Sequence, residues 1–135
     1  MATTLTNWAG NLQFNATMLR RPDSADEICE IVRSSSRVKV LGTRHSFNEI
    51  ADTSGDLISL ENLDRIVSLD RDPRRPSVTI EGGMTCGRLG EYLHAAGFAL
   101  HNMASLPHIT VVGAVLTATH GSGDRSSTSS SVSCQ

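Results

Sequence analysis

The stretch VKVLGTRHSFNEIA, residues 38–51, combines two features that decide the fold class. It opens with apolar residues that alternate with Lys39, a pattern that predicts a β-strand. Gly42 follows directly and predicts a turn, because glycine tolerates unusual backbone conformations and lets the chain approach a ligand closely. The turn carries His45 and Ser46, so polar side chains with reactive chemistry follow the end of a predicted strand.

A helix is predicted immediately before this strand, over residues 24–34. Ser24 begins it, since its hydroxyl can accept from the backbone N–H of Glu27 while the Glu27 carboxylate returns to the Ser24 amide. The helix is expected to end in the serine run 34–36. Its predicted apolar face consists of Ile28, Ile31 and Val32.

Three further runs are predicted to be strands: residues 57–60, 66–69 and 78–80. A second helix is predicted over 86–96, because Leu89 and Leu93 share one face and Gly97 can end it. Helices alternating with short strands indicate an α/β (α+β) fold. We therefore expect a small mixed sheet flanked by the helices at 24–34 and 86–96.

The composition excludes several classes of function. The 135 residues carry a formal net charge of −2, with one Trp, one Tyr and three Phe, which does not suit a nucleic-acid-binding surface. No apolar run reaches the length of a transmembrane segment, so a cytoplasmic protein is expected. The three cysteines lack CxxC spacing and the histidines lack i, i+4 spacing, so no metal site is predicted. The common dinucleotide, nucleoside-triphosphate and hydrolase motifs are also absent.

The turn after Gly42 has two interpretations. Its successive backbone N–H groups could form a concavity for a pyrophosphate, with the Ser46 hydroxyl as a further donor. The His45 imidazole could then act as a base, a ligand or a nucleophile. An ordinary turn that exposes a histidine fits the same residues.

A second stretch of interest, residues 102–123, is rich in small side chains. They would let the backbone lie against a flat ligand, and they equally suit close packing between elements. These two readings stay open from the sequence.

Four stretches in order along the chain resemble the alditol oxidases, a group that includes xylitol oxidase. They are NWAGN at 7–11, VLGTRHSFNEIA at 40–51, NMASLPHIT at 102–110 and THGSG at 119–123. The alditol oxidases are FAD flavoproteins of the vanillyl-alcohol oxidase type, with a PCMH-type FAD-binding domain. The resemblance implies this fold for residues 12–123. Because the family's members are much longer, it also implies a truncated domain, an absent substrate domain and a flexible serine-rich tail at 124–135.

The resemblance also implies roles for individual residues. His45 would join covalently to the 8α-methyl carbon of the flavin, and Ser105 would contact the substrate near the reactive edge of the flavin. Arg44 stands where a glycine is common in the family, so its side chain must point away from the pyrophosphate or contact it. The remaining residues implied to bind FAD are Val40, Leu41, Gly42, Thr43, Arg44, Ser46, Ala104, Thr110, Gly113, Thr117, Ala118, Thr119 and His120.

The implied reaction moves a hydride from a carbinol of a polyol to FAD, after which O2 is reduced to hydrogen peroxide. The expected partners of the parent enzyme are thus a polyol and O2, and the 135-residue chain alone is expected to be inactive. Two alternatives remain. The chain could belong to a sugar-1,4-lactone oxidase, which shares the His45 turn, or it could be a non-catalytic flavin-binding or inert fragment.

Overall fold

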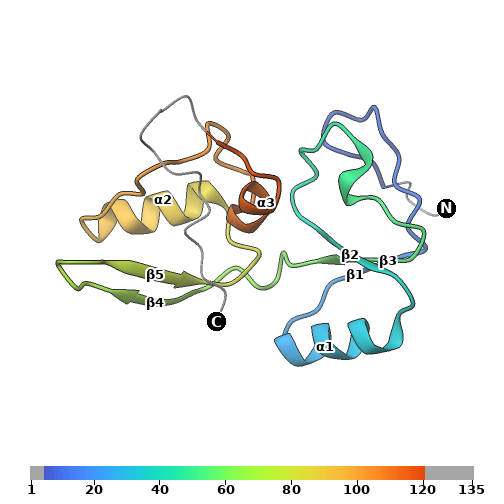
Figure 1. Ribbon diagram of the computed structural model, residues 1–135, viewed down its shortest axis with the longest axis horizontal. Coiled ribbons are helices and arrows are strands. Elements are labelled where there is room, and N and C mark those ends of the chain that lie inside the picture. Colours follow the sequence, from blue (N-terminus) through green and yellow to red (C-terminus); the bar gives the residue numbers. More distant parts are fainter. Residues whose placement is uncertain (1–4, 121–135) are drawn as a thin grey trace. The chain divides into compact units, whose positions relative to one another are not determined.

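The computed structural model of the chain describes residues 5–120, which excludes the predicted tail at 124–135. The chain divides into two compact units, Met1–Leu63 and Asp64–Gln135 (Figure 1). Each unit has its own sheet and its own buried apolar cluster, and each is described by itself.

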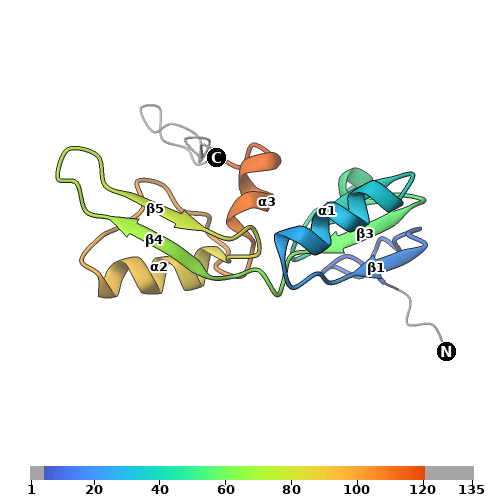
Figure 2. The same cartoon turned by 90° about the horizontal axis from the view of Figure 1, so that it is seen from below.

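The first unit is built on a three-stranded parallel sheet with strand order β1-β3-β2. Its strands are β1 (Met18–Arg20), β2 (Val38–Leu41) and β3 (Asp56–Ser59). Parallel neighbours need crossover connections. Helix α1 (Ala25–Ser34) leads from β1 to β2, and the short helix η1 (Glu49–Ala51) lies between β2 and β3. Figure 2 shows α1 running along this sheet.

Helix α1 begins as the sequence predicts, because the Ser24 hydroxyl accepts from the Glu27 N–H at 3.2 Å. The second half of the predicted capping box is wrong. The Glu27 carboxylate accepts from the N–H of Asp23 at 2.8 Å, one residue before the cap. The apolar face is also narrower than predicted, since Val32 is 48% exposed whereas Ile31 is half-buried. A sheet of three short strands covers only part of the helix surface.

The core of the first unit gathers around Leu57, which is completely buried in the central strand β3. Leu41 at the end of β2 and Phe14 from the N-terminal segment complete the buried cluster. Leu41 directly precedes Gly42, so the buried end of β2 anchors the loop that carries His45.

The second unit contains an antiparallel hairpin and two helices. The elements are β4 (Ile66–Asp70), β5 (Ser77–Ile80), α2 (Cys86–Ala95) and α3 (Val111–Leu116). Helix α2 lies along the hairpin (Figure 1) and buries Leu89 and Leu93 together with Met84. Gly97 ends the helix at φ 82°, a left-handed conformation that favours glycine.

The α/β fold class and the flanking helices are confirmed, and the strands predicted from sequence lie within two residues of the observed bounds. The parallel strand pairs lie in the three-stranded sheet of the first unit, and the antiparallel pair forms the separate sheet of the second unit. Strand β1 and helix α3 were not predicted. Strand β1 has only three residues, and α3 is a six-residue run of Val, Gly, Ala and Leu without strong helical periodicity.

Candidate cofactor site

The loop between β2 and η1 holds several of the residues that the sequence predicts to bind a cofactor. Asn48 ends it, since the Asn48 Oδ1 accepts from the Ile50 N–H at 3.1 Å and starts η1. The same oxygen accepts from the Ser46 hydroxyl at 2.8 Å. The Ser46 hydroxyl, predicted as a ligand donor, is therefore engaged inside the loop.

Arg44 is the residue of this loop that has a left-handed backbone conformation. Its φ is 65°, and only Arg44 and Ala118 among the non-glycine residues in 5–120 have a positive φ. Gly42, where the sequence suggested the special conformation, is not among the positive-φ residues there. The left-handed region favours glycine, so an arginine at this position needs contacts that compensate the strain.

The Arg44 side chain points to the N-terminal segment. Its Nη1 donates to the Thr6 carbonyl at 3.0 Å, which supplies the contact that the sequence left open. The guanidinium therefore spans from the loop to the chain ahead of the NWAGN motif. This bond is one of the contacts that hold Arg44 in its left-handed conformation.

The backbone of the loop offers hydrogen-bond donors. Within residues 5–120, the N–H groups of Thr43, Arg44 and Ser46 donate no hydrogen bond. Neighbouring N–H groups around a left-handed residue form the concave arrangement that binds anions. The loop therefore has backbone donors of the kind that an anionic ligand needs.

The NWAGN motif, residues 7–11, lies beside this loop (Figure 1). Asn7 is 3% exposed, and its side-chain amide is fully used. Its Nδ2 donates to Asn11 Oδ1 at 2.9 Å and to the Ser46 carbonyl at 3.1 Å, while its Oδ1 accepts from the Leu12 N–H at 3.1 Å. Asn7 therefore ties the motif to itself and to the loop. The sequence pointed to this motif but assigned it no role.

Trp8 contacts the predicted flavin-linking residue directly. Its backbone N–H donates to the Arg44 carbonyl at 2.8 Å. Its indole stacks on the His45 ring, with the ring centroids 4.9 Å apart and the planes inclined by 28°. The indole is 64% exposed, whereas His45 is half-buried and its Nε2 is buried.

In the second unit, the NMASLPHIT stretch packs along the start of α2. The Gly87 N–H donates to the Pro107 carbonyl at 2.6 Å, and the Cys86 N–H donates to the Ile109 carbonyl at 2.9 Å. A Cβ at Gly87 would meet that carbonyl oxygen at 3.0 Å, and one at Gly90 would meet the Met103 sulfur at 3.2 Å. The two glycines thus let this stretch lie against the helix.

The Cys86 thiol lies near the backbone of Ala104, the residue before Ser105. Burial raises the pKa of the Cys86 thiol, and a hydrogen bond with the Ala104 backbone opposes that rise without cancelling it. Ala104 is half-buried and Ser105 is exposed. The Ser105 hydroxyl is therefore available to a bound molecule.

At least one of the small residues around α3, Gly113, is required for close packing. The Thr110 hydroxyl caps the helix by accepting from the Gly113 N–H at 3.2 Å, and a Cβ at Gly113 would lie 2.6 Å from that oxygen. Thr117 donates to the Gly113 carbonyl at 2.9 Å, so its hydroxyl is also engaged within the turn. Ala118 follows at φ 52°. The Thr119 N–H returns to the helix at the carbonyl of Ala114, at 2.8 Å.

The predicted site residues thus form two groups. Val40 to Ser46 comprise the end of β2 and the loop that follows it in the first unit, and Ala104 to His120 belong to the second unit. His120 and Thr117 are exposed, while Thr110 is buried. Their roles in binding FAD remain predictions.

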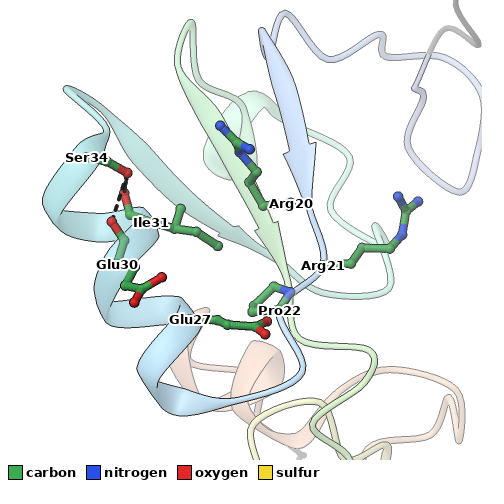
Figure 3. A pocket seen from close by; sticks show the side chains of 7 residues that line it. All are labelled: Arg20, Arg21, Pro22, Glu27, Glu30, Ile31 and Ser34. Atoms are coloured by element: carbon green, nitrogen blue, oxygen red, sulfur yellow. Dashed lines mark hydrogen bonds between the residues drawn. The ribbon is translucent and has the colours of Figure 1, made fainter.

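The hollow drawn in Figure 3 lies away from these residues. It has a volume of about 340 Å³ and lies between the end of β1 and α1. Its two arginines are already paired, Arg20 with Asp56 at 3.5 Å and Arg21 with Glu61. We assign it no part in cofactor binding. Within residues 5–120, no group of three or more His, Cys, Asp and Glu side chains could hold a metal, and no helix could span a membrane.

Comparisons with known proteins identify the family of the chain. The family model described as "FAD binding domain" matches residues 16–135. An alditol oxidase from Streptomyces sp. is 44% identical over 126 residues, and an L-gulono-1,4-lactone dehydrogenase from Mycobacterium tuberculosis is 36% identical over 123. These alignments cover 91% and 88% of this chain, but only 30% and 28% of the two relatives.

A solved structure shares the fold. The cholesterol oxidase from B. sterolicum superposes with a TM-score of 0.75 at 14% sequence identity, over 87% of this chain and 24% of that protein. The resemblance to FAD flavoproteins inferred from the four motifs is confirmed by the family match. The chain therefore belongs to the FAD-binding domain family.

Proposed function

We propose that this chain is the FAD-binding part of an oxidase of the alditol type, and that His45 carries the FAD covalently. The similarity to an alditol oxidase supports the assignment, at 44% identity against 36% for the lactone dehydrogenase. The observation that carries it is the loop after β2, with its left-handed Arg44 and three donor N–H groups.

In this proposal the loop holds the pyrophosphate. The N–H groups of Thr43, Arg44 and Ser46 would donate to the phosphate oxygens, which anion-binding backbone concavities do in other proteins. Val40 and Leu41, which end strand β2, and Gly42 would bring the backbone to the cofactor without a bulky side chain at the turn.

His45 would supply the nitrogen of the covalent link. A neutral imidazole has one unprotonated nitrogen, which is a competent nucleophile. The link would replace one C–H bond of the 8α-methyl group and the imidazole N–H bond by a C–N bond. The two hydrogens and their two electrons would leave with dioxygen as hydrogen peroxide. When bound, FAD supplies hydride acceptance from a carbinol and electron transfer to O2.

Roles toward FAD and its substrate are also proposed for residues of the second unit. Ser105, with an exposed hydroxyl, would contact a polyol substrate. A cytoplasmic location stays a prediction from the sequence. The further residues proposed to line the cofactor are Ala104, Thr110, Gly113, Thr117, Ala118, Thr119 and His120.

The test is the absorbance of the purified chain, incubated with FAD, before and after acid precipitation. We expect flavin colour to stay with the precipitated wild type and to be lost from His45→Ala. A matched variant, His94→Ala, removes an exposed histidine in the last turn of α2 and should keep the colour. Acid-stable flavin in His45→Ala would refute the assignment of the link.

A sugar-lactone oxidase is the second candidate, because an L-gulono-1,4-lactone dehydrogenase aligns with nearly the same part of the chain. The two candidates differ in the substrate that approaches Ser105. Perturbation of the bound-flavin spectrum by xylitol, and not by a 1,4-lactone, would favour the alditol type. The opposite preference would favour the lactone type.

A further inference from the structure

Trp8 has an unusual combination of exposure and contact. It is the only tryptophan of the chain, and 64% of its surface is exposed, so it contributes little to the buried core. Its indole nevertheless stacks on the His45 imidazole at a centroid distance of 4.9 Å. An exposed indole with one face on the His45 ring indicates a local role at that ring.

The backbone around Trp8 holds this stack from both sides of His45. The backbone N–H of Trp8 donates to the carbonyl of Arg44, the residue before His45, at 2.8 Å. The Asn7 side chain bonds to the carbonyl of Ser46, the residue after it, at 3.1 Å. Asn7 itself is fixed by its bonds within the 7–11 motif. The motif thus sets the distance between the two rings.

We propose that Trp8 is a positioning residue that holds the His45 imidazole in one orientation for its covalent link to flavin. The inference rests on the proposed function of His45. The torsion that turns an imidazole about its Cβ–Cγ bond is broad, so the ring of an unsupported histidine samples many orientations. The indole face restricts this rotation through an offset aromatic contact. A held orientation raises the fraction of encounters in which the reacting atoms meet.

Phe47 provides a matched control for this role. It is also aromatic and exposed, at 69%, and it lies in the same loop only two positions beyond His45. The aromatic contact found at His45 involves Trp8. Removing the Phe47 ring tests whether any exposed aromatic in this region affects the link.

The first measurement needs no cofactor. In proton–carbon NMR spectra of the chain, the imidazole signals of His45, identified by their loss in His45→Ala, should be shifted upfield by the indole ring current. Trp8→Ala should return them to the position of an unstacked histidine, and Trp8→Phe should retain part of the shift. Signals that do not move in Trp8→Ala would overturn the proposal.

The second measurement is the rate at which acid-stable flavin forms after FAD is added. We expect Trp8→Ala to slow it about threefold to tenfold, the factor typical of losing one aromatic pair interaction. Trp8→Phe should recover most of the rate, and Phe47→Ala should match the wild type. Far-UV circular dichroism and the amide NMR spectrum establish that each variant is folded.

The outcomes distinguish the positioning role of Trp8 from the proposed flavin link at His45. If acid-stable flavin forms equally fast in wild type and folded Trp8→Ala, the positioning role is refuted while the proposed function stands. If folded wild type forms no acid-stable flavin, the proposed link at His45 fails and the positioning role fails with it. If Phe47→Ala slows the reaction as much as Trp8→Ala, a specific role for Trp8 is refuted.

Discussion

The left-handed conformation of Arg44 allows a prediction in which the usual effect of glycine is reversed. Arg44→Gly and Arg44→Ala both remove the guanidinium that donates to the Thr6 carbonyl at 3.0 Å. The two variants therefore differ mainly in backbone preference at φ 65°. Alanine pays the steric penalty of this conformation, and glycine does not.

The size of the difference follows from two opposing terms. The left-handed conformation costs a non-glycine residue about 1–2 kcal/mol. Alanine recovers about 0.4–1 kcal/mol of this, because its unfolded chain has less conformational entropy to lose. We expect Arg44→Gly to be more stable than Arg44→Ala by about 1 kcal/mol. With a urea slope of about 2 kcal/mol per molar, the midpoints differ by about 0.5 M.

The assay is urea unfolding followed by the fluorescence of Trp8, which lies in the same unit as Arg44. Arg33, in the last turn of α1, is the matched control in that unit. There the helical backbone should reverse the order, with Arg33→Ala more stable than Arg33→Gly by about 0.5–1 kcal/mol. If Arg44→Ala equals or exceeds Arg44→Gly in stability, the loop conformation on which the anion site rests is wrong.

Three further outcomes follow from the described residues. Gly55→Ala should destabilise the chain by about 2 kcal/mol in urea unfolding, because the new Cβ would lie 2.2 Å from the Arg37 carbonyl oxygen and 2.7 Å from its Cβ; an unchanged midpoint would contradict this packing. Burial raises the pKa of Asp52, but hydrogen bonds from neighbouring amide groups outweigh it and leave that pKa below its ordinary value. The stability that this carboxylate contributes is therefore present above pH about 4 and is lost as the pH falls through its folded pKa. The difference in unfolding free energy between wild type and Asp52→Asn should thus shrink on acidification. A difference that does not change with pH would contradict the lowered pKa of Asp52. Cys29 is exposed, while Cys86 is buried with a raised thiol pKa. Peptide mapping after thiol labelling at pH 8 should therefore show Cys29 modified before Cys86, and equal rates for these two without denaturant would disprove the burial of Cys86.

The secondary structure could be predicted wherever the sequence contains strong local signals. Helix α1 has a serine cap and α2 ends at Gly97, and both were placed within one residue. Strand β1 could not be predicted, because its three residues become a strand only by pairing with β3. The division into two sheets also depends on long-range pairing, which local patterns do not specify.

The candidate site was predicted in part. The sequence led to His45 and its turn through the order of residue types after a strand. It suggested the special backbone conformation at Gly42, whereas the structure places it at Arg44, where contacts with the N-terminal segment compensate the strain. The Trp8–His45 stack could not be predicted, because it joins two segments that are distant in sequence. The sequence indicated the importance of Trp8 only through the motif at residues 7–11, to which no role was assigned.

The most direct test of the central claim is the intact mass of the folded chain after incubation with FAD, followed by peptide mapping. The wild type should gain the mass of one FAD less two hydrogens, and the modified peptide should contain His45. His45→Ala, folded by circular dichroism, should gain no mass that survives denaturation. A folded wild type without the added mass, or with FAD linked to a different residue, would contradict the account of this loop as the site of covalent flavin attachment.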